Sequence, residues 1–249
     1  LLAATSVVGL IKSEDSGQTW SELSTPKKVS HAAFGADDQV IYAACGSEGL
    51  WKSADQGKTW AAAQNGINAK CVIVEVVVDP QTPENVYCIG NSGWNGHFYR
   101  SVDAAANWSE VRSFKKDMQA NPTLPDEWST VPGTASMSSL KNLALNPSNP
   151  RELYVAANWR LCFSADGGQT WEERDAGADI TCVSDIRFLD GKTYVTAMDE
   201  GIMASPDNGA TWQQLSPRKY ANDISGHQWR AHVAKKPDGA VKIVTTCSP

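Results

Sequence analysis

One eight-residue pattern recurs along the chain and constrains its fold more than any other feature of the sequence. The five copies read SEDSGQTW, SADQGKTW, SVDAAANW, SADGGQTW and SPDNGATW, and their aspartates are Asp15, Asp55, Asp103, Asp166 and Asp207. Successive aspartates lie 40, 48, 63 and 41 residues apart. Propeller blades and solenoid units repeat at this spacing. The pattern therefore predicts one four-stranded sheet for each copy.

The residues of the pattern are those of a tight turn. Each copy follows a short apolar run that ends in Ser (GLIKS, GLWKS, HFYRS, RLCFS, GIMAS), which is typical of a strand that runs into a turn. Asp and Ser side chains accept hydrogen bonds from nearby backbone N–H groups, and a Gly can adopt positive φ. The closing tryptophans can pack back over the turns: Trp20, Trp60, Trp108, Trp171 and Trp212. The copy around Asp103 lacks the Gly and the Thr, which predicts a looser or differently shaped turn.

The pattern S-x-D-x-G-x-T-W resembles the Asp-box of the bacterial neuraminidase repeat. That repeat occurs in sialidases, xyloglucan-type endoglucanases, sortilin-type receptors and photosystem assembly propellers. The stretches CVIVEVVVDPQTPENVYCIG and GHFYRSVDAAANW look most like blades of the endoglucanases. The resemblance implies an all-β fold, a β-propeller of four-stranded antiparallel blades with Asp-box hairpins between the third and fourth strands. It also implies that the Asp-boxes lie at the periphery, away from any catalytic centre. The resemblance therefore predicts the architecture and not the activity, because a shared fold does not imply a shared function.

The strand pattern divides residues 1–249 into the blades of a single β-propeller, or of part of one. The expected blades are approximately 1–20 (partial), 21–60, 61–108, 109–171 with an insertion at 113–136, 172–212 and 213–249 (partial). A closed five-bladed ring could join the two ends, but one second strand would be surplus. The surplus favours a ring of six to eight blades, of which this chain is a piece or one subunit.

Composition excludes several classes of partner. The net charge of -6 and the pI near 5.2 argue against a nucleic-acid partner, because such binding needs clustered Lys and Arg. The apolar runs are too short for a membrane span. The six cysteines lack the spacing of a zinc site, so we expect no metal and no cofactor. Isolated thiols in strands are typically buried, and we expect these cysteines to be buried thiols. Neither a signal peptide nor an initiator Met is present, which suggests a processed product or a fragment, and we expect an extracellular or periplasmic location.

The predicted inner strands share a polar position. Aligning them places five residues together: His31, Glu75, Asn142, Asp185 and Arg230. The residues that follow are mostly apolar, as in Val76-Val77 and Leu143-Ala144. A buried charge must find a partner or a ligand. The set could therefore line a central channel that binds a ligand, or it could form structural ion pairs, and the second interpretation is favoured.

Four tryptophans outside the repeated pattern are expected on the face away from the Asp-boxes: Trp94, Trp128, Trp159 and Trp229. Flat aromatic rings near carboxylates are what a sugar-binding surface would use, and the nearby carboxylates here are Asp126, Glu127, Glu48 and Glu200. For any single Trp, simple packing is the alternative. His227, close to Trp229 and Arg230 in the sequence, is the only histidine in a cluster that hints at chemistry, and a structural role for it is favoured.

Glycoside hydrolysis would need two carboxylates about 5 to 9.5 Å apart. The candidates are Asp185, Glu75, Asp126 and Glu127. The chain lacks the arginine triad and the Arg-Ile-Pro signature of sialidases, and it has no GxSxG, P-loop or HExxH motif. A sialidase is therefore disfavoured.

Three functions remain open. The first is a secreted or periplasmic module that binds a carbohydrate or a protein through the face opposite the Asp-boxes. The second is a glycoside hydrolase that resembles the endoglucanases. The third is a scaffold or assembly subunit, and in each case a further chain or segment could complete the propeller.

Overall fold

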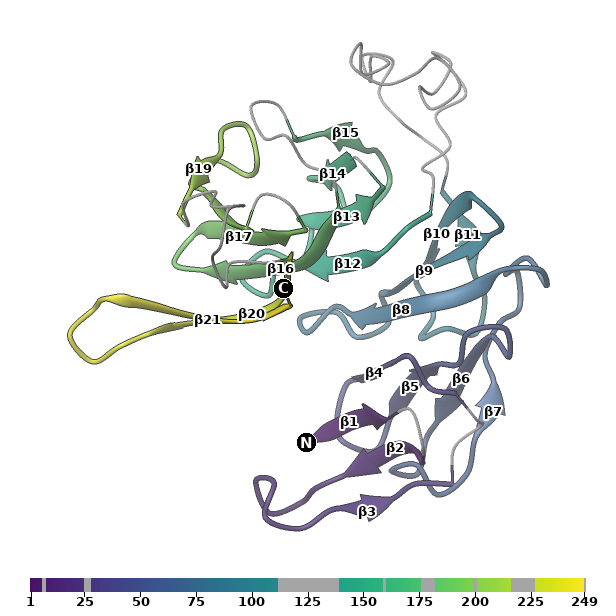
Figure 1. The fold of residues 1–249 in the computed structure, drawn as a ribbon. Helices are drawn as coiled ribbons and strands as arrows, with labels where there is room; N and C mark the ends of the chain where they lie inside the picture. The colour runs from purple at the N-terminus through teal and green to yellow at the C-terminus, as the bar shows by residue number, and fades with distance from the viewer. Residues whose placement is uncertain are drawn as a thin grey trace. The chain divides into compact units, whose positions relative to one another are not determined.

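The computed structural model describes residues 1–5, 8–24, 28–111, 139–158, 160–175, 182–198, 201–215 and 227–248. These residues form antiparallel β-sheets joined by turns, and the described part contains no helix that could span a membrane (Figure 1). The chain divides into two compact units, residues 1–112 and 113–249. The all-β architecture that the repeat predicts is confirmed, because all the described elements are β-strands. Each sheet pairs strands that follow one another in the sequence.

The first unit contains one three-stranded and two four-stranded sheets. The three-stranded sheet consists of β1 (Leu2–Thr5), β2 (Gly9–Lys12) and β3 (Ser21–Glu22). The next sheet consists of β4 (His31–Phe34), β5 (Ile41–Ala44), β6 (Leu50–Ser53) and β7 (Ala61–Ala62). The last consists of β8 (Val72–Val78), β9 (Val86–Ser92), β10 (Asn95–Ser101) and β11 (Ser109–Glu110).

The second unit contains two four-stranded sheets and one two-stranded sheet among its described residues. The first sheet consists of β12 (Asn142–Leu145), β13 (Leu153–Ala157), β14 (Arg160–Ser164) and β15 (Glu172–Glu173). The second consists of β16 (Val183–Leu189), β17 (Lys192–Ala197), β18 (Gly201–Ser205) and β19 (Gln213–Gln214). The two-stranded ribbon consists of β20 (His227–Lys235) and β21 (Val241–Ser248). The insertion at 113–136 lies outside the described residues.

In the sheet β4–β7, the second strand is apolar on both faces because this sheet packs on both sides. Side chains alternate between the two faces of a strand. In β5, Ile41 and Ala43 belong to a buried cluster with Leu10 of β2, whereas Tyr42 and Ala44 belong to a second cluster with residues of β8–β10. A continuous apolar run such as IYAA is therefore required, and an alternating polar pattern would leave one face unpacked.

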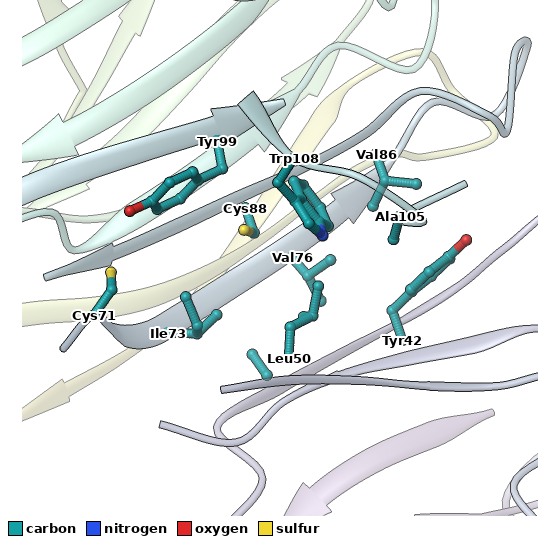
Figure 2. Packing of buried hydrophobic residues seen from close by; sticks show 11 residues of the cluster. Tyr42, Leu50, Cys71, Ile73, Val76, Val86, Cys88, Tyr99, Ala105 and Trp108 are labelled. Atoms are coloured by element: carbon teal, nitrogen blue, oxygen red, sulfur yellow. The ribbon is translucent and has the colours of Figure 1, made fainter. Parts of the chain in front are cut away.

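The second of these clusters fills the space between the sheets β4–β7 and β8–β11 (Figure 2). It includes Leu50, Ile73, Cys88, Tyr99 and Trp108, none of which is more than 5% exposed. Burying each large side chain contributes roughly 1.5–3 kcal/mol. A corresponding cluster joins the sheets β12–β15 and β16–β19 in the second unit.

The five cysteines whose side chains are described are free thiols, and four of them are buried: Cys45, Cys71, Cys88 and Cys162. Burial raises the pKa of Cys45 to about 12 and that of Cys71 to about 11. Deep burial also raises the pKa of Cys88 and of Cys162. These thiols act as small apolar side chains, as their place in apolar strands predicts.

Each copy of the repeated pattern forms a turn between the last two strands of its sheet, which we call a repeat turn. In the copy that starts at Ser53, the hydroxyl donates to Asp55 Oδ1 at 2.7 Å and accepts from the Gly57 N–H at 2.8 Å. Asp55 Oδ1 accepts from the Thr59 N–H at 2.8 Å, and Oδ2 accepts from the Thr59 hydroxyl at 2.6 Å. These bonds, first of all that from the Thr59 hydroxyl, lower the pKa of Asp55 to about 2.

The turn around Asp103 has the same hydrogen bonds, so the expectation of a looser or differently shaped turn is wrong. Asn107 replaces the Thr and donates to Asp103 through its backbone N–H at 2.9 Å and its Nδ2 at 2.8 Å. The Ala105 N–H donates to the Ser101 hydroxyl at 2.9 Å, as a Gly does in the other copies. Ala105 adopts φ +68°, so alanine takes the left-handed conformation at the position of that Gly.

Four of the five tryptophans that close the repeat turns fall into two groups. The indole N–H groups of Trp20 and Trp60 donate to carbonyls of their own turns, at Gly17 and Gly57. The indole of Trp108 instead donates to Ala63 at 2.8 Å, and that of Trp212 donates to Arg174 at 2.8 Å. These acceptors follow the fourth strand of the preceding sheet, so Trp108 and Trp212 connect neighbouring sheets.

Candidate functional site

In three of the five inner strands, a β-bulge precedes the predicted polar position. Strand pairing shifts register between Ile73 and Glu75 in β8, between Val183 and Asp185 in β16, and between Gln228 and Arg230 in β20. A bulge inserts one extra residue and redirects the side chains that follow it. The aligned position that the sequence predicts is therefore a repeated structural feature in these three strands, although their bulges were not foreseen.

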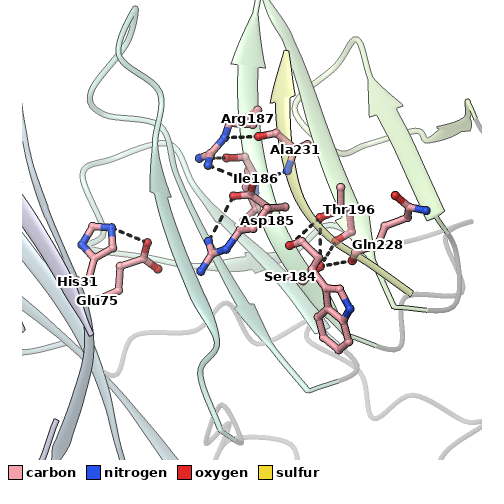
Figure 3. A network of polar contacts seen from close by, with 11 residues as sticks. His31, Glu75, Ser184, Asp185, Ile186, Arg187, Thr196, Gln228 and Ala231 are labelled. Atoms are coloured by element: carbon pink, nitrogen blue, oxygen red, sulfur yellow. Dashed lines mark hydrogen bonds and ion pairs between the residues drawn. The ribbon is translucent and has the colours of Figure 1, made fainter. Parts of the chain in front are cut away.

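In the first unit, this position brings His31 and Glu75 together. His31 Nε2 lies 3.3 Å from Glu75 Oε1, and their side chains are 34% and 10% exposed (Figure 3). The two residues come from the neighbouring inner strands β4 and β8. The pair can link the two strands, and its partly exposed imidazole can also face a ligand.

In the second unit, the buried carboxylate of Asp185 is surrounded by donors. Its Oδ2 accepts from the Ala231 N–H at 2.8 Å and lies 3.0 Å from Arg187 Nη2, while its Oδ1 accepts from the Ile186 N–H at 3.1 Å (Figure 3). Arg230 Nη1 lies 3.7 Å from the same Oδ1. Asp185 is fully buried, whereas Arg187 and Arg230 are 46% and 62% exposed. The carboxylate thus joins β16 to β20 and holds two guanidinium groups at the surface.

The remaining predicted site residues lie in different surroundings. Asn142 is buried at the start of β12. Trp229 lies at the bulge of β20 and is 38% exposed. Several predicted residues lie outside the described part of the chain: Asp126, Glu127, Trp128, Trp159, Glu200 and the side chain of His227. Their roles stay predictions.

Trp94 is the most exposed of the large apolar side chains in the described residues, at 74%. It belongs with Gly93 to the two-residue turn between β9 and β10, where Ser92 pairs with Asn95. This turn lies at the opposite end of β10 from the repeat turn that begins at Ser101. The ring is therefore presented on the face on which the sequence predicts binding.

A groove of about 360 Å³ lies at the other end of the first unit's sheets, beside the repeat turns. Its walls are Lys52, Trp60, the segment 61–65 and the turn 104–106. Lys52 Nζ donates to the Ala104 carbonyl at 2.8 Å and lies 5.5 Å from the centre of the Tyr42 ring. The one charged side chain of the groove is thus engaged by the protein itself.

Two polar clusters were missed at the level of sequence. In the first unit, Ser92 Oγ lies 2.6 Å from His97 Nε2, and His97 Nδ1 lies 2.7 Å from Glu110 Oε1. Ser and His on either side of a two-residue hairpin, in NSGWNGH, were the available signal. In the second unit, burial and then the charge of Glu173 raise the pKa of Asp175 to about 7.

The described residues hold no group of three or more His, Cys, Asp or Glu side chains that could bind a metal ion. Their chemistry is that of hydrogen-bonding and aromatic surfaces, carboxylate–guanidinium contacts and the Ser92–His97–Glu110 cluster.

Neither a family model nor a curated protein matches this sequence. Solved structures do resemble it. An ancestral GH74 enzyme has a TM-score of 0.73 and 14% identity, over 99% of this chain and 33% of its own. The extracellular domain of BT4673 from B. thetaiotaomicron has a TM-score of 0.65 and 10% identity, over 98% of this chain and 30% of its own. YCF48 from Cyanidioschyzon merolae has a TM-score of 0.56 and 13% identity, over 96% of this chain and 76% of its own.

These similarities show a fold of the β-propeller type and no activity, because a fold is shared by proteins with unrelated functions. The chain spans about a third of the length of the GH74 enzyme that it matches.

Proposed function

We propose that this chain is a segment of an Asp-box β-propeller that binds a carbohydrate through the face opposite the repeat turns. The observation that carries the proposal is Trp94, a flat ring exposed at the tip of the β9–β10 hairpin. Asn91, Ser92 and Asn95 flank it in the sequence and supply amide and hydroxyl groups. An apolar ring face combined with hydrogen-bonding side chains suits a sugar, which has both an apolar face and hydroxyl groups.

Binding is a better proposal than hydrolysis of a glycosidic bond. A glycosidase must place a substrate between two carboxyl groups. Of the candidates that the structure describes, Asp185 is fully buried and its oxygens accept from three groups, while the Glu75 side chain is 10% exposed and lies against His31. Both arrangements favour structural roles for these two carboxylates.

The assembly and the location of the protein are part of the same proposal. We propose a ring larger than this chain alone supplies, completed by a further chain or segment, and a secreted or periplasmic protein. The likeness to an extracellular domain supports the location. A scaffold role is the alternative, and it would use the same exposed face for a protein partner.

The test is a titration of the whole chain with a panel of soluble oligosaccharides that includes β-glucans, monitored by calorimetry. We expect Trp94→Ala to weaken the binding of any responding sugar roughly tenfold, which corresponds to about 1.4 kcal/mol. The matched control is Ala62→Arg, which fills the groove at the opposite end of the sheets. It should leave the affinity unchanged.

Two results would contradict this proposal. If no oligosaccharide binds, a scaffold role is favoured over a carbohydrate-binding one. If Ala62→Arg abolishes binding while Trp94→Ala does not, the ligand occupies the groove beside the repeat turns and the proposed face is wrong.

A further inference from the structure

Ser92, His97 and Glu110 stand in the relation of a hydrolytic triad. Ser92 ends β9, His97 lies in β10 and Glu110 lies in β11, so three adjacent strands of one sheet position them. Their contacts are 2.6 Å from the serine hydroxyl to His97 Nε2 and 2.7 Å from His97 Nδ1 to the Glu110 carboxylate. A triad is recognised by this geometry and not by the order of its residues in the chain.

The hydrogen bonds select the form of His97 that can act as a base. An ionised carboxylate only accepts hydrogen bonds, so Nδ1–H donates to Glu110. In the neutral ring, Nε2 then carries the lone pair and accepts from the Ser92 hydroxyl. The ring is only 6% exposed and stacks at 6.0 Å from Tyr99, which holds its orientation.

The surroundings of Ser92 leave room for a substrate. The serine is partly exposed at the end of its strand, directly before the turn formed by Gly93 and Trp94. These two residues lie outside the paired positions of β9 and β10, so the ladder does not use their N–H groups and two backbone donors remain next to Ser92 in the sequence. A Cβ built at Gly93, where φ is +62°, meets no atom within 4 Å.

We infer that this cluster is an esterase site, with Ser92 as nucleophile, His97 as general base and Glu110 as the residue that positions the imidazole. Ser92 Oγ attacks the ester carbonyl carbon and its proton passes to His97 Nε2. The bond between that carbon and the alcohol oxygen breaks, and the leaving oxygen takes the proton from His97. Water then attacks the acyl group, gives a proton to His97 and releases the acid as Ser92 regains its proton.

The neighbouring Trp94 indicates the class of substrate. Its ring follows Ser92 by two residues and is exposed, so an alcohol group that is itself a ring can stack on it. We assign the site to short-chain esters of sugar hydroxyl groups. This choice of alcohol rests on the proposed carbohydrate binding, whereas the triad itself does not.

A small alkyl fluorophosphonate tests the nucleophile directly, because it loses fluoride to an activated serine and forms a stable bond to its oxygen. Trypsin releases residues 71–100 as one peptide, and Ser92 is the only serine within it. We expect the label on this peptide of the intact chain and its loss in Ser92→Ala. His97→Asn should slow labelling at least 100-fold, the usual share of a general base. Glu110→Gln should slow it less.

Ser109→Ala is the matched control, since Ser109 is exposed beside Glu110 and outside the cluster, and its labelling should equal that of the unmodified chain. Thermal melts establish that each variant is folded. An unlabelled 71–100 peptide in the intact chain, or labelling that is unchanged in His97→Asn, would mean that the cluster only braces the hairpin.

Acetylated and non-acetylated oligosaccharides separate this inference from the proposed function. Release of acetate that requires both Ser92 and Trp94 supports the full assignment. Labelling without any oligosaccharide binding would keep the triad and overturn the sugar as its alcohol group.

Discussion

At the scale of single residues, Ala105 shows how hydrogen bonds override a local preference. The corresponding glycines Gly17, Gly57, Gly168 and Gly209 adopt φ between +77° and +91°, whereas Ala105 adopts +68°. The left-handed conformation costs alanine roughly 1–2 kcal/mol. Its N–H bond to Ser101 and its burial, at 1% exposure, hold it there nonetheless.

The other four copies have Gly at this position, which suggests that Ala105→Gly would stabilise the protein. We expect little or no stabilisation. Relief of strain is offset by the loss of a buried methyl group, about 0.8 kcal/mol, and by the greater backbone freedom of an unfolded Gly, about 0.5–1 kcal/mol. We expect a change within about 0.5 kcal/mol in urea unfolding. A gain above 1 kcal/mol would show that strain dominates this turn.

The same turn contains a possible site of N-glycosylation at Asn107. Asn107-Trp108-Ser109 matches the sequon for N-glycosylation. However, Asn107 Nδ2, the atom that would carry the glycan, donates to Asp103 at 2.8 Å, and Trp108 is buried. We expect the tryptic peptide 101–112 to remain unmodified after expression in a glycosylating host. A glycan mass on this peptide would show that the turn opens or forms late.

At the scale of the structural element, the repeat turn depends on its buried serine as much as on its aspartate. Ser53 is 1% exposed, donates to Asp55 and accepts from Gly57. Ser53→Ala leaves a buried N–H without its acceptor, which should lower the free energy of unfolding by about 1–3 kcal/mol. The exposed Ser109→Ala should change it by less than about 0.5 kcal/mol. Equal urea midpoints for the two variants would contradict a structural role for the hydroxyl.

The segment after β15 should make stability depend on pH. The pKa of Asp175 is raised from 3.8 to about 7, by burial first and then by Glu173. Since the folded state holds a proton that the unfolded state has released, the stabilisation is present below pH 4 and is lost as the pH rises towards 7.

Asp175→Asn removes this titration. We expect the unfolding free energy of the variant, relative to the unmodified chain, to rise by about 2–4 kcal/mol between pH 4 and pH 7.5. Urea unfolding at four or five pH values measures the difference. A constant difference would show that Asp175 is ionised in the folded protein at pH 5.

At the scale of the whole molecule, the sheets could be predicted from the sequence, whereas the residues that meet in the candidate site could not. Turn chemistry and strand order are local, so five copies of one pattern could predict four-stranded units and the shared position of Glu75 and Asp185. The bulges that precede Glu75 and Asp185 were not foreseen, because register depends on pairing and packing across strands. Ser92, His97 and Glu110 meet only once three strands are aligned.

The repeat turns also bear on the order of events during synthesis. The bonds by which Ser and Asp close each turn join residues two to four positions apart, and strands pair with their neighbours in the sequence. Short loops have a low entropic cost of closure. A sheet can thus form soon after its last strand leaves the ribosome, before the following one is translated. Each copy of the pattern is translated just before the last strand of its sheet. Synthesis of a copy therefore marks the point at which one sheet can be completed, and the next sheet can then pack on it.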